Sequence, residues 1–131
     1  MILVDSNVPM YLVGAAHPHK IDARRLLERA VADGRRLVTD AEVLEEVLHR
    51  YVAINRRDAI QPCIDVLLEL ADEVLPVDLD TVQRAREIVL GRPELTARDA
   101  IHVASMERYG VREILSFDRH FDGVPGIVRL A

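Results

Sequence analysis

Short apolar runs alternate along the chain with longer segments in which apolar residues recur at helical spacing. The short runs have the length of buried parallel strands, because a strand that is covered on both faces is continuously apolar. The first run begins at Met1 and ends on Asp5, and the others span 36–39, 73–77, 113–116 and 127–130. The pattern therefore predicts five strands, the last of them at an edge of the sheet.

The longer segments predict helices between these strands. Ser6 favours a short helix that ends near Gly14, and residues 15–19 are expected to form a loop. The apolar stripe of the next helix, which should end at Gly34, consists of Ile21, Leu26, Leu27, Ala30 and Val31. Further helices are predicted over 39–54, 57–71, 79–90 and 96–109.

Strands that alternate with helices predict a parallel sheet between two layers of helices. We therefore expect a three-layer α/β sandwich with a central parallel sheet of four to five strands, and a single domain over residues 1–131. In such sheets ligands bind at the carboxyl ends of the strands. Residues that directly follow a strand are accordingly the first candidates for chemistry.

Charge and cysteine content narrow the class of protein. The formal net charge of −5 disfavours binding of nucleic acid by bulk positive charge, but it is compatible with a nuclease whose acidic site holds a cation. All basic residues except Lys20 are arginines, which suit phosphate contacts, although charged residues on helices usually serve solvation. A single cysteine, Cys63, and the lack of a membrane-length apolar run favour a cytoplasmic protein.

Carboxylates stand at the expected edge of the sheet. Asp5 and Asp118 follow strands, and Asp99 lies at the start of a helix. Because neighbouring strands are about 4.8 Å apart, side chains at their ends can share one ion, and Mg²⁺ or Mn²⁺ prefers oxygen ligands. Such a cation would polarise a phosphodiester and generate hydroxide from water at neutral pH.

Each acid also has a structural interpretation. Asp5 suits a helix cap, Asp118 suits a turn, and Asp99 forms a capping-box pattern with Thr96. On the helix over 39–54, the same pattern with Thr39 accounts for Glu42, whereas periodicity does not choose between the neighbouring acids Glu45 and Glu46. The acids at other predicted helix starts, interpreted as structural, are Asp40, Asp78 and Asp80.

Other chemistries find little support in the sequence. His102 lies one turn after Asp99, but no further ligand follows at zinc-site spacing, so we interpret it as a packed histidine or one that supports the site from behind. Cys63 has no nearby base in the sequence, and no glycine-rich phosphate loop is present. Aromatic residues make up 4% of the chain, which is too few for a base-stacking platform.

With these acids placed, the sequence resembles the PIN-domain family, and within it the VapC-type ribonuclease toxins. The resemblance rests on four segments in the family's order: ILVDSNV at 2–8, TDAEVLEEVLHRY at 39–51, LTARDAIHVAS at 95–105 and ILSFDRHFD at 114–122. Each segment alone is weakly diagnostic, whereas the four together are specific.

The resemblance implies a ribonuclease that depends on Mg²⁺ or Mn²⁺ and cleaves RNA. The acids that match the family's catalytic and metal-binding positions are Asp5, Glu46, Asp99 and Asp118. Asn7 and Ser116 match supporting polar positions, and Asp122 is expected to assist from its loop. The family further implies a homodimer and a cognate antitoxin whose tail fills a groove beside the acids.

Two alternatives stay open. A phosphatase of the haloacid-dehalogenase type also begins with a strand that ends in aspartate, but it requires a second aspartate where this chain has Asn7, and a catalytic lysine. The other alternative is a catalytically silent PIN-like scaffold that binds RNA or a protein. Cation binding without turnover would identify it.

Overall fold

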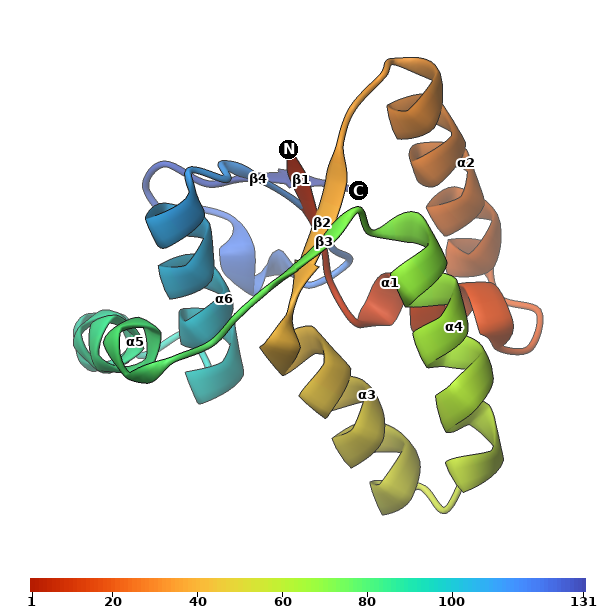
Figure 1. The fold of residues 1–131 in the computed structure, drawn as a ribbon, viewed down its shortest axis with the longest axis horizontal. Coiled ribbons are helices and arrows are strands. Elements are labelled where there is room, and N and C mark those ends of the chain that lie inside the picture. The colour runs from red at the N-terminus through yellow and green to blue at the C-terminus, as the bar shows by residue number, and fades with distance from the viewer.

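In a computed structural model, which describes residues 1–131, five strands form one central sheet in the order β3-β2-β1-β4-β5 (Figure 1). The strands are β1 Ile2–Val4, β2 Leu37–Asp40, β3 Glu73–Leu75, β4 Glu113–Leu115 and β5 Val128–Leu130. All neighbouring strands are parallel. The predicted parallel sheet is confirmed, with β1 at its centre and β5 at an edge.

Six α-helices connect and cover the strands. They are α1 Asn7–Val13, α2 Pro18–Ala32, α3 Ala41–Ala53, α4 Ile60–Leu70, α5 Leu79–Gly91 and α6 Ala97–Tyr109, with short 3-10 helices η1 Arg57–Ala59 and η2 Arg119–Phe121. Figure 1 shows α5 and α6 on one side of the sheet and α1, α2 and α4 on the other, while α3 extends away from the end of β2. This confirms the three-layer α/β sandwich.

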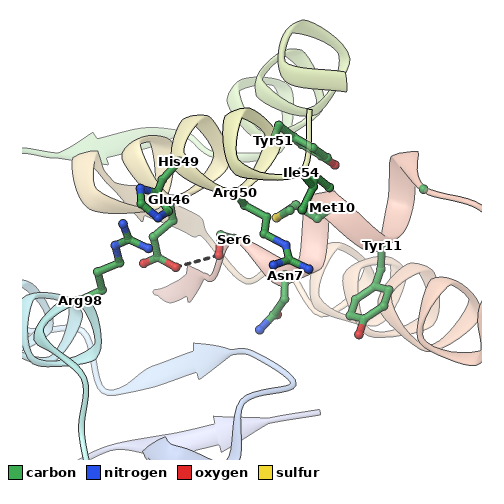
Figure 2. Close-up of a pocket in the computed structure, with 11 residues that line it drawn as sticks. Ser6, Asn7, Met10, Tyr11, Glu46, His49, Arg50, Tyr51, Ile54 and Arg98 are labelled. Carbon is green, nitrogen blue, oxygen red and sulfur yellow. Dashed lines mark hydrogen bonds between the residues drawn. The ribbon is translucent and has the colours of Figure 1, made fainter. Parts of the chain in front are cut away.

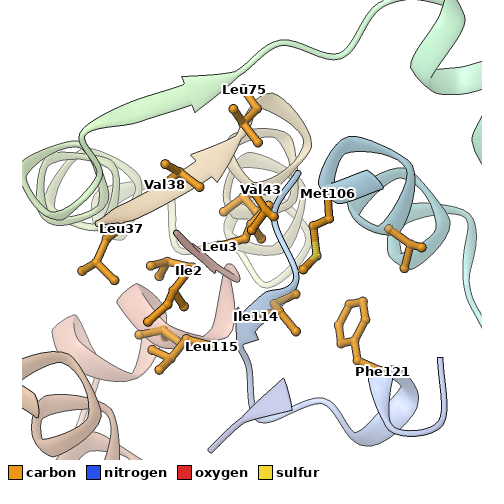
Figure 3. Packing of buried hydrophobic residues seen from close by; sticks show 14 of the residues in the cluster. Ile2, Leu3, Leu37, Val38, Val43, Leu75, Met106, Ile114, Leu115 and Phe121 are labelled. Atoms are coloured by element: carbon orange, nitrogen blue, oxygen red, sulfur yellow. The ribbon is translucent and has the colours of Figure 1, made fainter. Parts of the chain in front are cut away.

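The sheet contributes buried side chains to both helical layers (Figure 3). Ile2 and Leu115 point toward α1 and α2, whereas Leu3 and Ile114 point toward α6, where Met106 and Phe121 complete the packing. These side chains are at most 2% exposed, which explains why the strands are continuously apolar. No helix combines the length and the apolar character needed to cross a membrane.

Two predicted helix starts are wrong. Helix α2 begins at Pro18, inside the predicted loop, because the His17 ring accepts a hydrogen bond from the His19 N–H at 3.0 Å and proline suits a first turn. The predicted apolar stripe is also wrong in part, since Ile21 and Val31 are 56% and 62% exposed, and Ala23 is buried instead. Alanine at this position lets α2 pack closely against its neighbours.

The start of α3 likewise differs from the expected capping box. Thr39 belongs to β2, and its hydroxyl donates to the Val4 carbonyl at 3.0 Å. The cap is Asp40, whose Oδ1 accepts the Val43 N–H at 2.9 Å. The strand thus runs one residue further than predicted, and Glu42 takes no part in capping by Thr39.

Candidate metal centre

Asp5 lies at the carboxyl end of the central strand, as predicted, and is only 4% exposed. Its Oδ1 accepts the Ser6 N–H at 2.8 Å, and its Oδ2 accepts the Ser116 hydroxyl at 2.6 Å. Burial, together with the charge of Glu46, raises the pKa of Asp5 to about 6, although His102 and the two hydrogen bonds act in the opposite direction. Burial is therefore the main reason why ionisation of Asp5 is disfavoured.

Glu46 is the acid of α3 that reaches Asp5 and its neighbours. Its Oε2 accepts the Ser6 hydroxyl at 2.9 Å (Figure 2), and its Oε1 contacts Nε2 of His102. Glu45 instead faces outward and pairs with Arg98 at 3.3 Å. The structure thus resolves the choice that periodicity left open, and the Ser6 hydroxyl orients Glu46 rather than capping α1.

His102 is a buried neighbour of three carboxylates. Its Nδ1 lies 2.7 Å from Oδ2 of Asp40, and its Nε2 lies 3.8 Å from Oδ1 of Asp5, in addition to the contact with Glu46. Burial lowers the pKa of His102, but Asp40, Glu46 and Asp5 outweigh it and raise the pKa well above the ordinary value. The predicted supporting position of His102 agrees with this geometry.

Asp40 makes a contact with His102 that the sequence did not predict. It caps α3, as expected of an acid at a helix start, but it is also completely buried and holds the His102 ring. The available signal was its position directly after the strand predicted over 36–39, which resembles the position of Asp5 after the first strand.

Asp99 and Asp118 lie together around His120. Nδ1 of His120 is 3.3 Å from Oδ2 of Asp99 and 3.2 Å from Oδ1 of Asp118. The capping box of α6 is present, because Asp99 accepts the Thr96 N–H at 3.1 Å and the Thr96 hydroxyl accepts the Asp99 N–H. Asp118 also accepts the His120 N–H at 2.9 Å, so both acids have structural contacts as well.

The four predicted acids are divided between two groups of possible ligands. Asp5 and Glu46 lie with His102, and Asp99 and Asp118 lie with His120; within each group the ligand atoms are at most 4.8 Å apart. Ser116 connects the groups, because its hydroxyl donates to Asp5 and accepts the Asp118 N–H at 3.0 Å. The sequence analysis proposed the four acids and a supporting role for His102, but it did not single out His120.

Two further predicted residues have different environments. The Asn7 amide donates to the Ser116 hydroxyl at 3.2 Å, so Asn7 supports the connection between Asp5 and Asp118. Asp122 instead binds the Arg129 guanidinium at 2.8 and 3.1 Å, which engages its carboxylate away from either group. Its expected assistance therefore has no counterpart in the structure.

A cavity of about 660 Å³ opens beside Glu46, between α1 and α3 (Figure 2). Ser6 and Glu46 line the end that adjoins the acids, and Asn7 and Tyr11 line the α1 side. Arg50 extends into this space from α3 (Figure 2). The cavity thus has carboxylates at one end and the guanidinium of Arg50 on its α3 side. This combination suits a phosphodiester.

The donor set of the site fits a hard or borderline divalent cation. Its ligand atoms are carboxylate oxygens with one imidazole in each group. Carboxylates suit Mg²⁺ and Mn²⁺, whereas an imidazole is a more usual ligand of transition metals. The raised pKa of Asp5 points the same way, because a bound cation would offset the repulsion and the burial that raise it.

Comparisons with known proteins agree with this geometry. Residues 2–127 match the PIN domain family. The chain is 60% identical to Ribonuclease VapC13 of Mycobacterium tuberculosis over the full length of both chains. The crystal structure of M. tuberculosis VapC20, described as a sarcin-ricin loop cleaving toxin, superposes with a TM-score of 0.73 at 22% identity and 90% coverage of each chain. A toxin-antitoxin complex from Klebsiella pneumoniae gives a TM-score of 0.70 at 18% identity, covering 98% of this chain and 96% of that one. The chain belongs to the PIN-domain family and, within it, to the VapC ribonucleases.

Proposed function

We propose that this VapC ribonuclease is an endoribonuclease that requires Mg²⁺ or Mn²⁺, and that Asp5, Glu46, Asp99 and Asp118 are its catalytic and metal-binding residues. The observation that carries the proposal is the buried Asp5 beside Glu46, with a pKa raised to about 6. A buried carboxylate beside a second, partly buried one favours a cation. When bound, this cation would polarise the scissile phosphate and lower the pKa of the attacking water.

The protein's own residues hold this site in shape. Ser6 fixes Glu46 through its hydroxyl and Asp5 through its N–H, so adjacent groups of one residue set the two carboxylates relative to each other. Ser116 performs the same task for Asp5 and the backbone of Asp118. Arg50 supplies positive charge from the adjoining cavity, where a guanidinium suits a phosphate of the RNA strand.

Family membership supports the expected partners. We infer that the chain is the cytoplasmic toxin of a toxin-antitoxin pair and acts as a homodimer. The K. pneumoniae relative of this fold was solved as a toxin-antitoxin complex, which supports the expectation of an antitoxin. An antitoxin segment that occupies the cavity beside Glu46 would block access to the acids. Purified antitoxin should therefore inhibit cleavage in proportion to complex formation.

Cleavage of total cellular RNA by the purified protein tests the proposal. Fragments should form with Mg²⁺ or Mn²⁺, disappear with EDTA, and be absent for Asp5→Asn, which keeps the shape of the side chain but removes its charge. Asp33→Asn, which changes an exposed aspartate at the end of α2, should cleave like the wild type.

The result also separates the alternatives. Equal cleavage by wild type and Asp5→Asn would refute the assigned acids. Cation binding by calorimetry without cleavage of any RNA, in a protein that binds RNA, would identify the silent scaffold instead.

A further inference from the structure

Four rings gather beside the acidic site. His19 stacks on Phe117 with ring centroids 4.3 Å apart and an interplanar angle of 15°. Tyr11 meets both of these rings edge-on, at 5.0 and 5.4 Å, and His17 lies 4.9 Å from Tyr11 and 5.0 Å from His19. We call Tyr11, His17, His19 and Phe117 the ring cluster. Because histidines complete it, the low aromatic content of the chain did not predict it.

The ring cluster is joined to the acidic site by the backbone. Phe117 lies between Ser116, which holds Asp5, and Asp118. The Phe117 N–H donates to the Asn7 side chain at 3.3 Å, and Tyr11 follows Asn7 by one turn of α1. A ligand in contact with these rings would therefore lie beside the residues that hold Asp5 and Asp118.

The rings are also accessible. His17 is exposed, and Tyr11, His19 and Phe117 are half-buried, in contrast to Phe121 and Tyr51, which are buried in the core. Tyr11 lines the same cavity as Arg50 (Figure 2). Arg50 forms no ion pair, and the neighbouring carboxylates of Glu42 and Glu45 pair with Arg98 instead. The cavity that leads to Glu46 is thus lined by the aromatic ring of Tyr11 and by the guanidinium of Arg50.

We propose that the ring cluster stacks a base of the RNA substrate next to the scissile phosphate, while Arg50 binds a phosphate of the same strand. This proposal rests on RNA being the substrate. Every nucleobase has a π-face, and single-stranded RNA is bound by stacking on Phe, Tyr or His together with cationic groups along the backbone. Tyr11 and His19 offer the required rings, and Arg50 the charge.

Fluorescence of 2-aminopurine tests stacking without cleavage. The probe is a short single-stranded RNA with one central 2-aminopurine and random flanks, mixed with the full chain in EDTA. Stacking should quench the probe on binding to the wild type. Tyr11→Leu and His19→Leu should each lose most of the quenching and bind about tenfold more weakly. Tyr11→Phe and His19→Phe, which keep a ring, should retain both.

The control is Tyr109→Leu, which removes a ring on α6 that contacts Arg108 rather than the ring cluster. It should quench like the wild type, and melting temperatures should verify that all variants are folded. Equal quenching by wild type, Tyr11→Leu and His19→Leu would overturn the proposal, and so would absence of quenching by the wild type. Metal-dependent cleavage of cellular RNA, measured in parallel, shows whether the ribonuclease assignment fails with it.

Discussion

Nδ1 of His102 lies 2.7 Å from Oδ2 of Asp40, and both side chains are buried. The other oxygen of Asp40 accepts the Val43 N–H and begins α3, the helix that carries Glu46. One carboxylate therefore sets both the start of this helix and the ring that contacts Glu46. The position of Glu46 depends on the backbone and on a side chain from α6 at the same time.

Asp40→Asn should separate these two tasks. Asparagine is a good helix cap, so α3 should still begin at the same residue. The amide does not replace the charge that holds His102, and loss of such a supporting contact typically weakens metal binding or activity by about 10- to 100-fold. Mn²⁺ titration and cleavage rates measure this effect. The control is Asp78→Asn, which changes the analogous cap of α5 and should leave Mn²⁺ affinity and cleavage rate unchanged. Equal Mn²⁺ affinity of the Asp40→Asn and Asp78→Asn variants would contradict the role of Asp40.

Asp5→Asn should abolish cleavage and yet stabilise the metal-free protein. The pKa of Asp5 is about 6 in the folded state against 3.8 ordinarily, so ionised Asp5 opposes folding above pH 6. Its removal should raise the free energy of unfolding by about 1 to 3 kcal/mol at pH 8. The gain in stability should largely disappear near pH 4, where the folded chain holds the proton and the unfolded chain holds it for nearly half of the time. Urea unfolding in EDTA at the two pH values measures it, and a large loss of stability at pH 8 would show a structural role instead.

Cation affinity should depend on pH through the same group. Protonated Asp5 does not bind a cation, and its pKa of about 6 means that protons compete below this pH. The apparent affinity for Mn²⁺ should therefore be nearly constant above pH 7 and fall about tenfold per pH unit below 6, for one competing proton. Calorimetric titrations between pH 5 and 8 follow this change. A constant affinity down to pH 5 would place the metal on other ligands.

Two buried serines form a matched pair for a fourth prediction. Ser116→Ala removes the hydroxyl that donates to Asp5 and accepts from Asn7 and Asp118, so it should lower stability by about 1 to 3 kcal/mol and weaken Mn²⁺ binding. Ser105 is equally buried, but its hydroxyl has no hydrogen-bond partner. Ser105→Ala should be neutral or stabilising, because the unsatisfied group is lost. Thermal melts and Mn²⁺ titration compare the two variants, and similar effects of both on Mn²⁺ binding would contradict the role of Ser116.

The sequence predicted most of this fold because its strands are short, continuously apolar and separated by regular helices. It was less successful where a local pattern does not decide which of several residues is buried or which one caps a helix. The stripe of α2 was misjudged because Ala23, a small residue, occupies the closely packed face, while Ile21 is exposed. The cap of α3 was misjudged because Thr39 and Asp40 are both good capping residues, and only the register of β2 decides between them.

The candidate site shows the same limit. Sequence position places Asp5 and Asp118 after strands, and the family motif selects Glu46 over Glu45; that the two strands are neighbours is known from the sheet order. The pairing of His102 with Asp40, by contrast, joins residues 62 positions apart across two elements, and no local pattern encodes it. The ring cluster is not predicted for a similar reason, since His19 in the first turn of α2 and Phe117 after β4 are far apart in the sequence and meet only in the folded chain.

The central position of β1 has a consequence for synthesis of this enzyme. Val4 pairs with Leu115, so the strand that carries Asp5 acquires its second neighbour only after the ribosome has added β4, and Asp118 follows three residues later. A nascent chain that ends before this point has Asp5 and Glu46 but neither Ser116 to hold Asp5 nor Asp118. The proposed ribonuclease site can therefore assemble only after β4 and the residues that follow it have been synthesised.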